Sequence, residues 1–147
     1  MITKEHNFNK YCCFYVSDFH LEMILLPYIK DKMDKTKFAI ITEENLSESM
    51  KILLDRTNLN IDEKNKILNL NWDNKNIEDI AKYNFNEKTI IIKGSINYIS
   101  RINEKIEKIK PKKINIIDCY NINEKSLKVE EIQEKYDKIL NTKNIKK

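Results

Sequence analysis

The sequence predicts an α/β domain in which a mostly parallel sheet of about four or five strands is covered by helices on both faces. Short apolar runs alternate along the chain with longer segments whose apolar residues recur every three or four positions. The runs are continuously apolar, as expected for strands buried on both sides. We therefore expect a single three-layer Rossmann-like or flavodoxin-like domain over residues 1–147, with frayed ends at about 1–9 and 142–147.

The first strand and the first helix are expected to meet at Asp18. Residues 11–17 (YCCFYVS) form a continuous apolar run, and Ser17 or Asp18 is expected to be the N-cap of the helix. Apolar residues then recur at helical spacing to about Asp34, and Pro27 should bend this helix.

The middle of the chain carries a clear strand and weaker signals. Residues 37–42 (KFAIIT) read as a buried strand, and Asn45 with Glu48 resembles a capping box that opens a helix. Beyond it we expect a short helical turn at 62–66, a weak edge strand at 67–71 (ILNLN) and a short helix at 76–82.

The last part repeats the strand and helix alternation. Residues 89–93 (TIIIK) predict a strand, a helix follows over 96–110, and Pro111 ends it. Residues 114–119 (INIIDC) predict the last strand. Ser126 is expected to cap a terminal helix that carries the apolar residues Leu127, Ile132, Tyr136, Ile139 and Leu140.

Composition narrows the class of protein. Hydrophobic residues make up 41% of the chain, and 27 basic residues nearly balance 23 acidic ones, so the chain should fold. No stretch is apolar enough for a membrane span, and residues 1–13 lack the order of a secretion signal, so we expect a cytoplasmic protein. Cys12, Cys13 and Cys119 lack zinc-site spacing and are expected to behave as small apolar residues, with a redox role as the alternative.

Glycine usage excludes two large classes of nucleotide site. The chain has one glycine, Gly94. Dinucleotide-binding and P-loop motifs need several glycines so that the backbone can turn tightly and approach phosphate. Neither motif can be written with this sequence.

Polar residues follow the predicted strands and would share the carboxyl edge of a parallel sheet, where ligands of such folds bind. Asp18, Glu44 and Asn45 also stand where helix starts need caps or favourable negative charge, so a structural role is the alternative for such residues. The ligand-binding candidates are Asp18, His20, Glu43, Glu44, Trp72, Asp73, Lys93, Ser95 and Asp118.

Residues 16–21 (VSDFHL) resemble the first metal motif of calcineurin-like metallophosphoesterases, in which Asp-x-His follows the first strand. The resemblance implies Asp18 and His20 as metal ligands. The family's further Gly-Asp, Gly-Asn-His and Gly-His-x-His motifs are absent, and two ligands do not hold a metal pair. We therefore do not assign the chain to this family, and we interpret residues 16–21 first as the junction between a strand and the following helix.

Three functional hypotheses follow. The favoured one is a non-catalytic binding or adaptor domain that engages a protein partner or small polar ligand at the carboxyl edge, with no cofactor and with Trp72 as a possible exposed anchor. The alternative is a small Mg²⁺- or Mn²⁺-dependent enzyme acting on phosphoesters or nucleotides, with Asp18, Glu43, Asp73 and Asp118 as ligands. Nucleic-acid binding ranks last, although residues 101–147 carry thirteen Lys/Arg against eight Asp/Glu and present the basic residues Lys105, Lys108, Lys112 and Lys113.

Overall fold

The computed structural model describes residues 8–73, 85–140 and 145–146. Its sheet has the order β2-β3-β4-β1-β5-β6, and its first five strands run parallel. The short β6 pairs antiparallel with β5. The strands are β1 (Phe8–Tyr15), β2 (Lys37–Thr42), β3 (Lys88–Lys93), β4 (Ile114–Asn121), β5 (Lys138–Leu140) and β6 (Ile145–Lys146).

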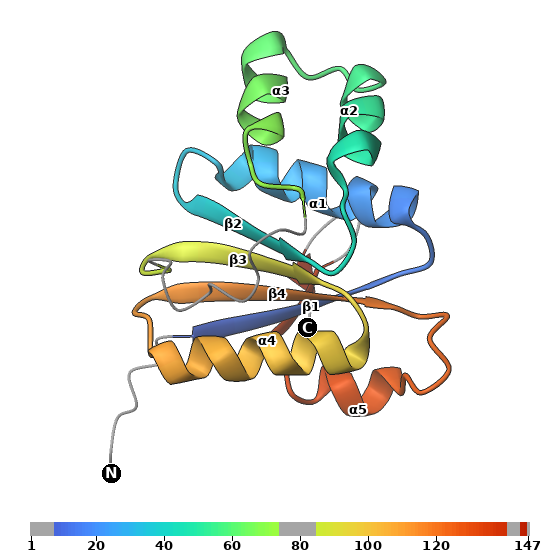
Figure 1. The fold of residues 1–147 in the computed structure, drawn as a ribbon, viewed down its shortest axis with the longest axis vertical. Helices are drawn as coiled ribbons and strands as arrows, with labels where there is room; N and C mark the ends of the chain where they lie inside the picture. Colours follow the sequence, from blue (N-terminus) through green and yellow to red (C-terminus); the bar gives the residue numbers. More distant parts are fainter. Residues whose placement is uncertain (1–7, 74–84, 141–144, 147) are drawn as a thin grey trace.

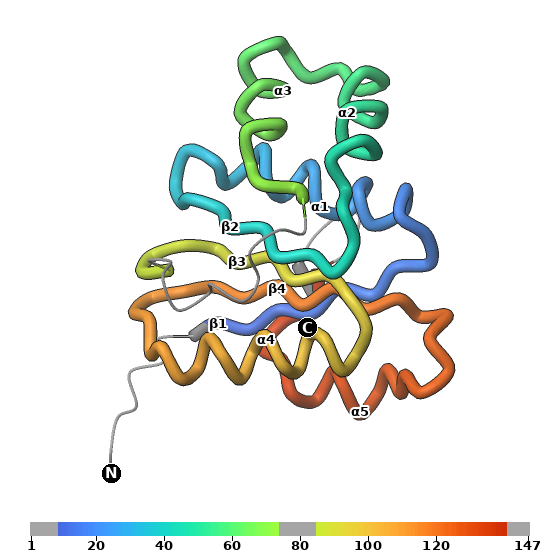
Figure 2. Tube along the Cα trace, in the orientation of Figure 1, coloured from blue at the N-terminus to red at the C-terminus, as the bar shows by residue number. Residues whose placement is uncertain are grey.

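Helices lie on both faces of this sheet (Figure 1). On one face lie α1 (Asp18–Lys32), α2 (Ser47–Asp55) and α3 (Ile61–Leu68), and on the other lie α4 (Ile96–Ile109) and α5 (Val129–Gln133). Figure 2 shows α2 and α3 standing farther from the sheet than α1. The three-layer α/β class predicted from the sequence is confirmed, and the strand order differs from both common doubly wound orders.

Successive residues of each buried strand face opposite sides of the sheet, so the hydrophobic core has two parts. Cys13, Ile91 and Ile117 pack with α1, α2 and α3, whereas Cys12, Ile90 and Ile116 pack with α4. Every one of these strand residues is at most 1% exposed, as their continuous apolar pattern predicted. All three cysteines are fully buried in strands, in agreement with the expected role as small apolar residues.

Local sequence signals explain where the helices begin and end. The hydroxyl groups of Ser17 and Ser95 accept hydrogen bonds from the third residues of α1 and α4. Asn60 and Glu63 form a reciprocal capping box at the start of α3. Pro111 follows the end of α4, and none of the described helices is long and apolar enough to cross a membrane.

Three sequence predictions were wrong. The N-cap of α2 is Leu46, which makes no side-chain cap hydrogen bond, so Asn45 and Glu48 do not form the expected capping box. Residues 67–71 do not form an edge strand, because Ile67 and Leu68 continue α3 and Ile67 is fully buried against the core. The segment after Ser126 is not one long helix. It forms the short helix α5 and then β5, whose Ile139 and Leu140 pair with Cys12 and Cys13.

Three further predictions concern the chain ends and the middle. The expected helix at 76–82 lies outside the described residues. Residues 8–9 belong to β1 and residues 145–146 pair with β5, so these parts of the expected frayed ends are ordered, and the rest of the expected ends lies outside the described residues. Pairing of Phe8 with Ile114 and of Asn9 with Asn115 explains the early start of β1.

Candidate functional site at the carboxyl edge

The direction of the chain crossovers reverses between β4 and β1, two neighbouring strands. From β1 the chain crosses through α1 to β2 at one side of the sheet, and from β4 it crosses through α5 to β5 at the other side. Such a reversal usually opens a crevice at the carboxyl edge. Here the loops bridge it, because Ile122 N donates to Tyr15 O over 3.0 Å and Asn123 Nδ2 donates to Val16 O over 3.1 Å. Where the crossover direction reverses, the carboxyl edge is therefore a bridged surface and not an open crevice.

Lys93, at the end of β3, forms the electrostatic centre of the carboxyl edge. The residue is only 5% exposed. Its Nζ lies 3.3 Å from Asp18 Oδ1 and 3.9 Å from Glu44 Oε2, and it sits over the Tyr15 ring at 5.5 Å from the centroid. The two carboxylates compensate a buried ammonium group that would otherwise be unfavourable.

Glu22 is a third carboxyl group near Lys93 and was not among the predicted site residues. It stands one helical turn after Asp18 and is 7% exposed, and its Oε1 has no hydrogen-bond partner within the described part of the chain. Burial and the nearby charge of Asp18 raise the pKa of Glu22 from 4.5 to about 7, against the lowering effect of Lys93. The i, i+4 spacing of two acids at a helix start was the sequence signal for this pair.

Glu43 ties the end of β2 to the start of α4. Its Oε1 accepts a 2.8 Å hydrogen bond from Ser95 N, and its own N–H donates to Lys93 O over 2.9 Å. The single glycine fits this close approach, since a Cβ at Gly94 would lie 2.4 Å from Tyr98 Cδ2 and 3.0 Å from Glu43 Oε1. The contacts explain Gly94 by packing rather than by phosphate binding.

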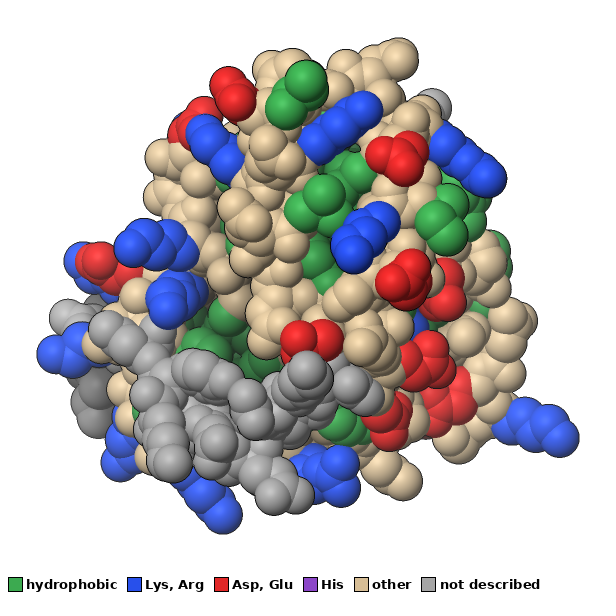
Figure 3. Space-filling model, turned by 45° about the horizontal axis from the view of Figure 1, so that its top comes forward, with side chains coloured by type: hydrophobic (Ala, Val, Ile, Leu, Met, Phe, Trp, Pro, Cys, Tyr) green, Lys and Arg blue, Asp and Glu red, His purple; other side chains and the backbone are tan. Residues whose placement is uncertain are grey.

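Exposed apolar side chains accompany the carboxylates. Phe19 and Met23 are 56% and 48% exposed and lie one turn apart at the start of α1, while Val16 and Ile122 are 48% and 41% exposed in the loops after β1 and β4. We call these four residues the apolar patch. Figure 3 shows Asp and Glu side chains gathered on the right of the view, the side toward which the parallel strands point in Figure 1. The four patch residues follow β1 or β4 or stand near the start of α1, so they share the carboxyl edge with the exposed carboxylates of Asp18 and Glu44.

Several sequence candidates occupy structural positions. His20 accepts a 3.0 Å hydrogen bond from Val16 N through Nδ1, so this nitrogen serves the strand-to-helix turn. Trp72 is not an exposed anchor, because it is 3% exposed and its Nε1 donates to Ile67 O over 2.7 Å. Asp73 follows Trp72, whose carbonyl accepts a hydrogen bond from Leu46 N.

Asp118 does not belong to the carboxyl-edge rim. β4 continues to Asn121, so Asp118 lies within the strand on the α4 face and is completely buried. It accepts hydrogen bonds from Asn103 Nδ2 over 3.1 Å and from Tyr136 Oη over 2.5 Å, and Tyr136 also contacts the Tyr120 hydroxyl at 2.5 Å. Burial raises the pKa of Asp118 from 3.8 to about 6, while these hydrogen bonds and the charge of Lys10 oppose the rise.

The predicted metal ligands do not converge. Among the described residues, no group of three or more His, Cys, Asp or Glu side chains is arranged to hold a metal ion. Asp18 pairs with Lys93, Glu43 bonds to Ser95, and Asp118 lies in the core. The shared carboxyl edge brings together Asp18, Glu43, Glu44, Lys93 and Ser95.

Comparison with known proteins identifies no relative. No protein-family model matches the chain, and neither curated proteins nor solved structures show significant similarity to it.

Proposed function

We propose that this chain is a non-catalytic binding domain that engages a protein partner at its carboxyl edge. The observation that carries the proposal is the apolar patch beside an acidic border. Large apolar side chains with a polar border are the usual anatomy of a protein interface, whose central anchors supply most of the affinity.

The charge of this edge defines the chemistry of the partner. Asp18 and Glu44 expose 54% and 71% of their side chains, while Lys93 is buried among them. A partner that presents apolar side chains flanked by Lys or Arg would match both features. The bridged loops after β1 and β4 favour a macromolecular surface over a deep small-ligand site.

The alternative function, a small metal-dependent enzyme, stays a prediction. No contact among the described residues favours it. Its proposed ligands Asp18 and Asp118 serve an ion pair and a buried hydrogen-bond network respectively. A stabilising shift with millimolar Mn²⁺ that Asp18→Ala abolishes would support it.

Site-specific photocrosslinking tests the binding proposal. A photoreactive phenylalanine analogue is placed at position 19, in the patch, or at position 61, where Ile61 is 75% exposed in α3. In a native extract we expect a discrete crosslinked protein from position 19 that weakens with added salt, since screening reduces charge attraction. Position 61 should give no such product.

Competition by unlabelled protein supplies the matched control. Excess wild-type chain and the Ile52→Ser/Ile61→Ser variant should both suppress the crosslink, because residues 52 and 61 are exposed in α2 and α3 and do not belong to the apolar patch. The Phe19→Ser/Ile122→Ser variant should not suppress the crosslink. Equal products from both positions, or full competition by the patch variant, would refute the proposal.

A further inference from the structure

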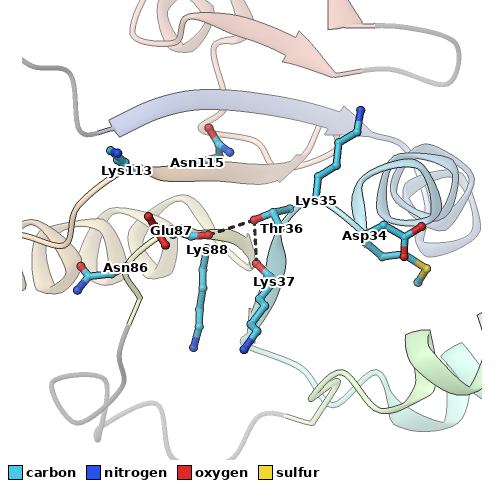
Figure 4. Close-up of a pocket in the computed structure, with 10 residues that line it drawn as sticks. Asp34, Lys35, Thr36, Lys37, Asn86, Glu87, Lys88, Lys113 and Asn115 are labelled. Atoms are coloured by element: carbon cyan, nitrogen blue, oxygen red, sulfur yellow. Dashed lines mark hydrogen bonds between the residues drawn. The ribbon is translucent and has the colours of Figure 1, made fainter.

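A groove of about 860 Å³ lies at the amino edge of the sheet, opposite the proposed protein-binding surface. Lys37 and Lys88 are the first residues of β2 and β3, and Lys113 precedes β4. Lys35 also lines the groove, so four of its lining residues are lysines, against two acidic residues, Asp34 and Glu87. We call this the amino-edge groove, and Figure 4 shows its residues.

Two of these lysines are held directly beside each other. Lys37 and Lys88 are register partners on neighbouring parallel strands, and Figure 4 shows their side chains extending side by side in the same direction. Neighbouring strands are only about 4.7–4.9 Å apart, and like charges that face each other across strands destabilise a sheet. The fold therefore tolerates an unfavourable charge pair at this position.

Nearby carboxylates do not neutralise the pair. No Asp or Glu of the described chain forms an ion pair with Lys35, Lys37, Lys88 or Lys113. Asp34 lies 3.9 Å from Lys66 Nζ instead. The charge of the groove is thus available to an external anion.

The turns that carry the lysines are connected to one another. Thr36 Oγ1 donates to Glu87 O over 3.3 Å, Glu87 N donates to Lys112 O over 2.9 Å, and Lys112 N donates to Asn86 Oδ1 over 2.8 Å. Glu87 and Lys113 adopt left-handed φ values of 62° and 55°. Such conformations are unfavourable for residues with a Cβ and are retained where the surroundings enforce them, often at ligand sites. These turns hold the lysine backbones in place before any ligand arrives.

The lining indicates the class of anion. The volume lies within the range of small-ligand sites. The described lining residues include no aromatic side chain on which a base could stack, and their cations are lysines, which act as point charges rather than as planar forks. A compact ligand with several negative charges fits these features better than a nucleic-acid strand.

We propose that the amino-edge groove binds a small anion carrying two or more phosphate groups, with Lys37 and Lys88 as its principal contacts. The ligand relieves the repulsion between the two ammonium groups as it binds. The site is separate from the carboxyl-edge surface and does not depend on the function proposed for that surface.

Calorimetric titration of the full chain with inorganic tripolyphosphate tests the proposal. We expect saturable binding that weakens as ionic strength rises, and weaker binding of inorganic phosphate, which has a single phosphate group. The Lys37→Gln/Lys88→Gln variant should bind tripolyphosphate about tenfold less tightly. This change corresponds to a loss of about 0.7 kcal/mol for each of the two charge contacts removed.

Two further double variants make the result specific. Lys35→Gln/Lys113→Gln removes the other two groove lysines and should also weaken binding. Lys51→Gln/Lys108→Gln removes the same charge from exposed positions on α2 and α4 and should change the affinity less than about twofold. Circular dichroism of each variant verifies that the fold is intact.

Three outcomes would overturn the proposal. The first is no binding of tripolyphosphate by wild-type protein at millimolar concentration. The second is equal weakening in the Lys51→Gln/Lys108→Gln control, which would indicate diffuse surface charge. The third is tighter binding of a single-stranded oligonucleotide than of tripolyphosphate through Lys37 and Lys88, which would identify a nucleic-acid surface instead.

Discussion

Lys93 Nζ lies 3.3 Å from Asp18 Oδ1, and the two side chains differ sharply in exposure, at 7% for Lys93 and 54% for Asp18. The pair links the end of β3 to the first turn of α1. Removing the exposed partner leaves a buried charge poorly compensated, which is more unfavourable than losing a surface ion pair.

Asp18→Asn should therefore lower the free energy of unfolding by about 1–3 kcal/mol in urea denaturation. Glu44→Gln is the matched control and should cost less than about 1 kcal/mol, because Glu44 is 3.9 Å from Lys93 and 71% exposed. In a Lys93→Met background the effect of Asp18→Asn should shrink. An unchanged effect in that background would show that Asp18 acts only on the helix terminus.

Glu22 should make stability depend on pH. Its folded pKa, about 7, exceeds its ordinary value of 4.5, so the folded state binds the proton more tightly. The resulting stabilisation is complete below pH 4.5 and is lost as pH rises to about 7.

Wild-type protein should lose stability between pH 6 and 7, and the Glu22→Gln variant should lose less. This pH range lies above the pKa of about 6 for Asp118. At pH 8 the variant should be more stable than wild type by about 1–2 kcal/mol, after allowance for solvent screening. Urea denaturation across this pH range measures the difference. Parallel pH profiles for the two proteins would contradict the prediction.

The Asp118, Tyr136 and Tyr120 network should contribute to the attachment of the C-terminal segment. Tyr136→Phe removes the hydrogen bonds that Tyr136 Oη makes with Asp118 and with the Tyr120 hydroxyl and should destabilise the protein by about 1–3 kcal/mol. Tyr28→Phe is a suitable control, because the Tyr28 ring packs against Tyr11 and Phe38 and its hydroxyl makes no hydrogen bond within the described chain. Thermal denaturation of both variants gives the comparison, and equal losses would exclude a special role for these hydrogen bonds.

The paired groove lysines should limit stability when no anion is bound. Lys88→Gln should raise the free energy of unfolding by about 0.2–0.5 kcal/mol at low salt, since it relieves repulsion from Lys37, its register partner. High salt should erase the gain through screening. Denaturation curves at two ionic strengths, with Lys51→Gln as control, measure this effect. A destabilised or salt-insensitive Lys88→Gln would contradict it.

The bounds of the central strands and of the flanking helices α1 and α4 were largely predictable. Residues 37–42 were predicted as a strand and are one, and α1 is capped by Ser17, one of its two expected caps. The helix α3 was also readable, because Asn60 and Glu63 have capping-box spacing. The alternating apolar residues of 67–71 predicted a strand instead, although Ile67 also fits the helical spacing of α3.

The C-terminal strand was not predictable from local sequence. Three residues, Lys138–Leu140, are too few for a periodic pattern, and the same apolar residues continued a helical spacing. They become a strand because β1 offers them an unpaired edge. Similarly, Asp118 was expected near the end of its strand, whereas pairing with β1 continues β4 to Asn121 and places Asp118 within the strand.

By itself the sequence determined the α/β class, the order of most elements and the polar character of the carboxyl edge, because buried strands, amphipathic helices and caps depend on neighbouring residues. The tertiary structure alone decided which charges meet. It buried Lys93 against Asp18, took Asp118 into the core and set Lys37 beside Lys88. These contacts join residues far apart in the chain, and strand order and register bring them together rather than any local pattern.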